Sequence, residues 1–213
     1  YEHLLSSLRS LFFIEEAAEL LKERIGLIIS DNFRKRARGV ADEIKEEAKE
    51  ARKFREENNI DELSEEERLL ENLEYMMARY QQELPGLRDL SLADFIEIIL
   101  VYKQVTSIQL STPGRKKDAK LLLLLSYIFH DLGTTVSTAH HIMLGGPLAK
   151  RVFLRLGFGK EDADLGAFYV SEHHIFPRLE AGDSSYHRLN AKLSSLSHQD
   201  TRSILAGEFI ITL

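Results

Sequence analysis

Residues 119–132 read AKLLLLLSYIFHDL, and this stretch decides how the rest of the sequence is interpreted. The apolar run Leu121–Phe129 has the composition of a buried helix, and the polar residues His130 and Asp131 follow it directly. An imidazole beside a carboxylate at the end of a buried helix is costly unless something compensates for both groups. A divalent metal ion does so, because histidine nitrogen and aspartate oxygen are both good ligands. The pair is therefore a candidate metal site.

More histidines follow at spaced positions, whereas the part of the chain before residue 130 contains only His3. The first four of these later histidines are His140, His141, His173 and His174. Each of them alone is more often a helix cap or a solvated side chain than a metal ligand. It is the combination of an apolar helix, a His–Asp pair and several spaced histidines that favours metal binding.

Helical periodicity dominates the chain, and no segment shows the alternation that is typical of a strand. Two capping-box patterns, beginning at Ser64 and Ser91, indicate helix starts. The sequence therefore predicts an all-α fold, with a charged N-terminal helical extension ahead of a helical bundle. The expected helices cover residues 4–29, 33–58, 64–83, 92–110, 117–130, 139–156, 161–175, 185–196 and 200–212. The highly charged helix 33–58 is expected to pack one face on the domain and to expose the rest.

Composition limits the classes of protein to consider. The chain has 213 residues, 44% of them hydrophobic, which suits a globular protein of one or two domains. The composition changes near residues 85–90, which predicts an N-terminal helical region over 1–88 and a histidine-bearing domain over 89–213. A net charge of −6 argues against nucleic-acid binding by overall electrostatics.

The chain contains no cysteine, so it has neither disulfides nor thiolate metal ligands. No apolar run reaches the length of a membrane span, and nothing resembles a signal peptide. We therefore expect a cytoplasmic protein with no membrane partner. Because the sequence lacks an initiator Met and stops within the apolar run 209–213, we expect it to be a piece of a longer protein.

Residues 117–176 resemble the HD superfamily of metal-dependent phosphohydrolases, and among its subgroups they are most similar to the HD domains of uridylyl-removing enzymes and tRNA nucleotidyltransferases. The resemblance covers less than a third of the chain. The matching pieces, in order, are the apolar helix from Ala119 to Leu125, the pair His130-Asp131, Gly133, the helix opening His141 to Ala149, the helix end Arg155 to Phe158, the acidic start Glu161-Asp162, and Val170 to His174.

The resemblance implies a metal-dependent phosphohydrolase or phosphodiesterase acting on a nucleotide or nucleotidyl phosphoester, with one or two divalent ions (Mn, Mg, Fe, Zn or Co). Asp131 is the implied catalytic residue, because its carboxylate could bridge two ions. The implied metal ligands are His130, Asp131, His141, His173, His174 and Glu208, with Asp200 as a second candidate for the last position. Three arginines could bind a substrate phosphate: Arg151, Arg178 and Arg155. The expected partner is a phosphorylated small molecule or nucleotide. The sequence does not decide whether the chain forms a homodimer.

Two departures from the family pattern favour an alternative function. The family usually has a histidine on the helix before the His–Asp pair, and this chain has none between His3 and His130. Thr134 stands where the family often has lysine. The alternative is a catalytically degenerate helical module of the same type, with a regulatory or protein-interaction role.

Overall fold

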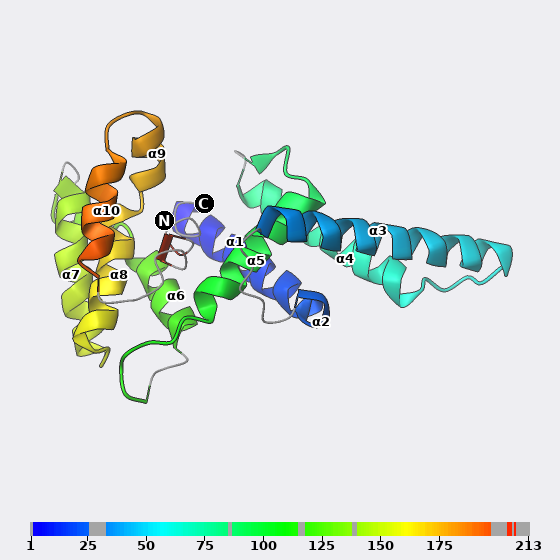
Figure 1. Cartoon of the computed structure of the whole chain (residues 1–213), viewed down its shortest axis with the longest axis horizontal. Helices are drawn as coiled ribbons and strands as arrows, with labels where there is room; N and C mark the ends of the chain where they lie inside the picture. The colour runs from blue at the N-terminus through cyan, green and yellow to red at the C-terminus, as the bar shows by residue number, and fades with distance from the viewer. Residues whose placement is uncertain are drawn as a thin grey trace. The chain divides into compact units, whose positions relative to one another are not determined.

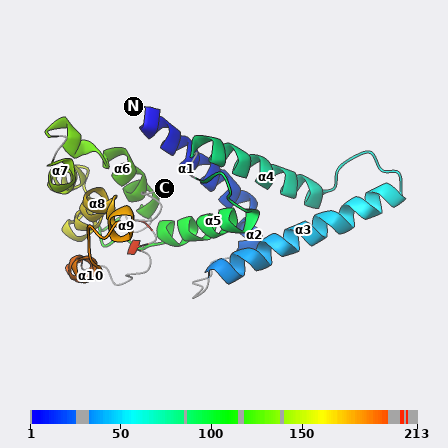
Figure 2. The same ribbon diagram turned by 90° about the horizontal axis from the view of Figure 1, so that it is seen from above.

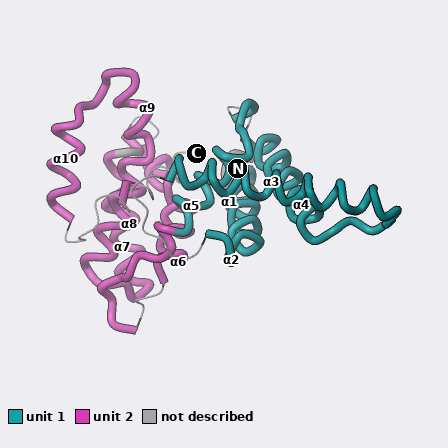
Figure 3. The backbone as a smooth tube through the Cα atoms, turned by 45° about the vertical axis from the view of Figure 1, so that its right-hand side comes forward, with its two compact units in different colours: residues 1–103 teal, residues 104–213 magenta. Residues whose placement is uncertain are grey.

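The computed structural model describes residues 2–25, 33–84, 87–114, 118–137 and 140–196, together with residues 204, 205 and 207. These residues form helices joined by turns and contain no strand, which confirms the predicted all-α fold class (Figure 1). The chain divides into two compact units, residues 1–103 and 104–213 (Figure 3). The boundary expected from composition, after residue 88, rests on a different criterion and stays a prediction.

Unit 1 is built around α4, which packs against both α1 and α3 (Figures 1 and 2). Its helices are α1 (Glu2–Leu20), α2 (Lys22–Ile25), α3 (Phe33–Glu57), α4 (Glu65–Glu83) and most of α5 (Leu92–Thr106). The charged helix α3 buries Val40, Ile44 and Ala48, which recur every four residues. It therefore packs one face on the unit and exposes its charged face, as its sequence predicts.

A buried carboxylate fixes the start of α4. Ser64 and Glu67 form a reciprocal capping box, in which each side chain bonds the other residue's main-chain N–H. The Glu67 side chain also accepts hydrogen bonds from Arg55, with Nε 3.0 Å away, and from Arg52. These hydrogen bonds, led by those from Arg55, lower the pKa of Glu67 below its ordinary value of 4.5.

The ion pair of Glu67 with Arg55 makes the free energy of unfolding depend on pH in a defined direction. A carboxylate whose pKa is depressed in the folded state stabilises it above the unfolded-state pKa, and this contribution disappears as pH falls through the folded-state pKa. Glu67→Gln keeps the capping box but removes the charge, so it should lower the urea midpoint at pH 7. The difference from wild type should shrink below about pH 4. Glu65→Gln, at the exposed neighbour, is the matched control.

Unit 2 is organised by α8, which packs against α7 along its length and also against α6 (Figures 1 and 3). Its elements are α6 (Ala119–Phe129), the 3₁₀ turn η2 (Leu132–Thr135), α7 (His141–Arg155), α8 (Lys160–Glu172), α9 (Ile175–Glu180) and α10 (Tyr186–Ser194). A glycine allows the close approach of α7 and α8, because a Cβ atom on Gly166 would lie 2.6 Å from the Phe153 ring. Phe153 is fully buried, so its ring has no free space to move into.

This contact gives a matched pair of substitutions. Gly166→Ala should destabilise the protein by about 1–3 kcal/mol, because the new methyl group overpacks a filled core. Gly39→Ala, in α3, meets nothing within 4 Å and should stabilise by about 0.5–1 kcal/mol through helix propensity. Urea unfolding followed by circular dichroism measures both. Equal effects of the two substitutions would contradict the tight contact between α7 and α8.

One predicted helix is wrong in a way that matters for the site. The sequence predicts a single helix over 161–175, but α8 ends at Glu172 and α9 begins at Ile175. Pro177 explains the break, because it lacks an N–H and its ring would clash with the carbonyl of His173, four residues earlier. The histidine pair therefore lies at a junction between two helices and not within one.

The other expected helices differ less. The expected helix 4–29 is interrupted at Leu21, the expected helix 92–110 ends at Thr106, and most of the expected helix 200–212 falls outside the described residues. Among the helices that the structure describes, none is both long enough and apolar enough to cross a membrane.

Candidate metal centre

Two histidines occupy the same structural position on different helices. His130 is the C-cap of α6 and His173 is the C-cap of α8. The Nδ1 atom of His130 lies 2.7 Å from the carbonyl oxygen of Tyr127, and Nδ1 of His173 lies 2.8 Å from that of Val170. A carbonyl oxygen only accepts, so each Nδ1 carries the proton. These bonds use carbonyls of the last helical turn, and they fix each ring; the oxygen of Tyr127 also accepts the main-chain N–H of His130.

The protonation state of His173 suits metal binding. Burial lowers its pKa to about 4, so the ring is neutral at pH 7. With the proton on Nδ1, its Nε2 atom presents a lone pair. A histidine whose other nitrogen bonds a carbonyl is the usual arrangement of a metal ligand, because that bond fixes both the tautomer and the ring orientation.

Asp131 lies next to both of these rings. One oxygen of its carboxylate is 3.2 Å from Nε2 of His130, and the other is 3.8 Å from Nε2 of His173. The two imidazole rings stand edge to face, with centroids 5.3 Å apart. The Asp131 side chain is 48% exposed while both histidines are buried, so the group is open to solvent on the carboxylate side.

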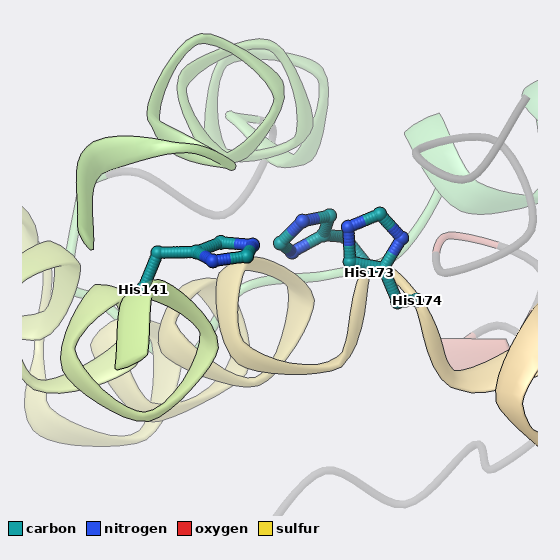
Figure 4. Close-up of side chains that lie close together, drawn as sticks. All are labelled: His141, His173 and His174. Atoms are coloured by element: carbon teal, nitrogen blue, oxygen red, sulfur yellow. The ribbon is translucent and has the colours of Figure 1, made fainter. Parts of the chain in front are cut away.

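His141 and His174 extend this group. His141 begins α7, His174 precedes α9, and both lie near His173 (Figure 4). One nitrogen from each of the three rings can be chosen so that all lie within 4.8 Å of one another, the spacing of ligands around a single ion. Burial is the main reason why the pKa of His174 is lowered, which favours the neutral, ligating form.

The centre depends on a close contact between η2 and α7. A Cβ atom built on Gly133 would lie 2.0 Å from the carbonyl oxygen of His141, a distance that no real side chain adopts. Gly133 is buried at this contact, and Asp131 precedes it by two residues. Only glycine therefore lets the segment after the His–Asp pair lie directly on the first turn of α7.

We expect Gly133→Ala to separate Asp131 from His141 and to weaken metal binding by about 10- to 100-fold, because the backbone must move. Helix content should change little, since the contact lies outside the helices' own hydrogen bonds. Isothermal titration of chelator-treated protein with Co²⁺ measures the affinity, and circular dichroism measures helix content. Gly39→Ala, in the other unit, is the control. Unchanged affinity in Gly133→Ala would show that the close contact does not position the centre.

The structure thus brings together His130, Asp131, His141, His173 and His174, all of which the sequence singles out. Glu208 and the alternative Asp200 lie outside the residues that the structure describes. Sequence reasoning missed the carbonyl groups of Tyr127 and Val170, because they belong to the main chain. A usable signal was present, since each histidine directly follows a helix and can reach the carbonyl three residues earlier.

The predicted phosphate-binding arginines lie in different places. Arg178, in α9, is close enough to His174 that its positive charge contributes to the lowered pKa of that ring, after burial, His141 and His130. Arg151 and Arg155 are exposed on α7 and line a separate cavity next to η2.

The donor set fits a divalent ion. It combines one carboxylate with four imidazoles, two of them oriented through Nδ1, and one of these, His173, is neutral at pH 7. Comparisons of the chain with protein-family models, with curated proteins and with solved structures found no match.

Proposed function

We propose that this chain is a metal-dependent phosphohydrolase domain of the HD type, acting on a nucleotide or nucleotidyl phosphoester. The observation that supports this most is the convergence of five metal-ligand side chains from the ends of α6 and α8, the start of α7 and the start of α9. Structural ion pairs also bring charged side chains together. However, they do not require two histidines that each bind a carbonyl through Nδ1 and turn Nε2 toward one carboxylate.

The donors also indicate the kind of metal. Imidazole suits Zn, Fe, Co and related transition metals, whereas Mg²⁺ prefers oxygen ligands and keeps several waters. Four imidazoles beside one carboxylate therefore favour a transition metal over Mg²⁺. The residues that would hold the ion are His130, Asp131, His141, His173 and His174.

When bound, a divalent ion supplies Lewis-acid chemistry, because it acidifies a water molecule and neutralises charge on phosphate oxygens. In hydrolysis the bond between phosphorus and the leaving oxygen breaks, and water supplies the new oxygen on phosphorus. The protein's own residues position these groups. Asp131, half exposed, provides negative charge at the open side of the centre. Arg178, near His174, provides positive charge for a substrate phosphate.

Asp131→Asn is the decisive substitution. It keeps the side-chain volume but removes the carboxylate that, among the described residues, lies against the imidazoles of His130 and His173. We expect it to lower Co²⁺ or Mn²⁺ affinity by about 10- to 100-fold and to lower metal-dependent hydrolysis of bis(4-nitrophenyl) phosphate with it. Helix content should be unchanged, since Asp131 lies outside α6 and η2.

Asp183→Asn is the matched control, because Asp183 is an exposed aspartate of the same unit. It should leave metal affinity and hydrolysis at wild-type values. If wild-type protein binds no transition metal, and Asp131→Asn matches it in stability and ligand binding, then the non-catalytic helical module is the correct reading. Metal binding without hydrolysis would also favour that module, with the ion in a structural role.

A further inference from the structure

A second feature of unit 2 lies on the same stripe of α7 as His141. Leu148, Val152 and Arg155 follow His141 by seven, eleven and fourteen residues, spacings that place all four positions on one face of the helix. At 1.5 Å per residue, Leu148 lies about 10 Å and Arg155 about 21 Å along the axis from His141. This stripe therefore runs from the metal centre toward the other end of α7.

A cavity of about 320 Å³ lies along this stripe, between α7 and η2. Its apolar part consists of Leu132, Val136, Leu148 and Val152, and its polar part of Thr135, Arg151 and Arg155. Leu132 directly follows Asp131, so the cavity begins one residue from the candidate ligands. The volume is near the lower end of the range for small-molecule sites.

The two arginines of the cavity differ from Lys150 of α7 and Lys192 of α10, which both have acidic partners. Lys150 pairs with Asp164, and Lys192 pairs with the buried Glu172. Among the described residues, neither Arg151 nor Arg155 has an acidic partner. They are four residues apart on one helix, where like charges repel each other. An anion bound between them would relieve that repulsion and could bond to both guanidinium groups.

From this arrangement we infer that the cavity binds the distal part of an extended substrate, with an apolar ring against the aliphatic side chains and a second phosphate on Arg151 and Arg155. The inference rests on the proposed function, because it places the scissile phosphate at the metal centre. Leu148 lies about 10 Å from His141 along the helix, several times the length of a hydrogen bond, so one phosphate cannot occupy both sites. The substrate class is therefore an extended nucleotidyl phosphoester whose second phosphate lies well away from the scissile one, and not a simple phosphomonoester.

Binding to metal-free protein tests the cavity separately from catalysis. The probe is adenosine 5′-monophosphate, compared with adenosine, in calorimetric titrations of chelator-treated protein. Wild type should bind the monophosphate about tenfold more tightly, since its phosphate gains contacts with two guanidinium groups. Arg151→Gln/Arg155→Gln should remove that difference. Arg188→Gln, at an exposed arginine of α10, should keep it.

Two results would overturn the inference: wild type that does not distinguish the monophosphate from adenosine, or a double variant that binds the monophosphate as tightly as wild type. Circular dichroism establishes that the double variant folds, and both substituted side chains are exposed. The double variant should also retain wild-type metal affinity, because neither arginine is a candidate ligand.

The same measurements separate this inference from the proposed function. If Asp131→Asn leaves metal binding unchanged while the arginine variant loses its preference for the monophosphate over adenosine, the phosphohydrolase proposal fails and the nucleotide cavity stands. If metal binding and hydrolysis depend on Asp131 but the arginine variants behave as wild type, the cavity inference fails and the proposed function stands.

Discussion

The hydrogen bonds from the imidazoles of His130 and His173 to carbonyl oxygens three residues earlier determine which nitrogen of each ring faces Asp131. A histidine that follows a helix can bond a carbonyl oxygen of the last helical turn. The same bond that finishes each helix thus orients a potential ligand. The helix ends of α6 and α8 are therefore part of the centre, and its geometry depends on where those helices stop.

Different residues set the path of the backbone at the ends of α6 and α8. Pro177 ends the helical path at His173, because a helix continuing through it would need an N–H that proline lacks and would bring its ring against that carbonyl. Gly133 acts after the other helix, where its missing side chain allows η2 to lie on His141. The centre therefore depends on one residue that restricts the backbone and on one that has no side chain. Neither would serve as a ligand, yet both control how far apart the ligands lie.

These causes explain what the sequence could and could not predict. The buried helix before His130, the capping boxes and the histidine spacing were all readable, because they follow from local periodicity and residue type. The break at His173 was missed although Pro177 was visible, since the pattern of apolar residues continued across it. Main-chain ligand partners have no residue type to recognise. Long-range consequences such as the contact of Gly133 with His141 depend on tertiary packing, which spacing along the chain does not encode.

The charges on and around α7 limit the kind of ligand that this face of the helix can bind. Lys150 of α7 pairs with Asp164, and Lys192 of α10 pairs with Glu172 of α8. Burial keeps His173 neutral, with a pKa of about 4, while the carboxylate of Asp131 faces its lone pair. A nitrogen lone pair that faces a carboxylate is stabilised by a cation. Arg151 and Arg155, which have no acidic partner among the described residues, are stabilised by an anion. One end of this helical face thus favours a metal ion and the other an anionic group. A metal-bound phosphoester with a second phosphate satisfies both requirements with a single ligand.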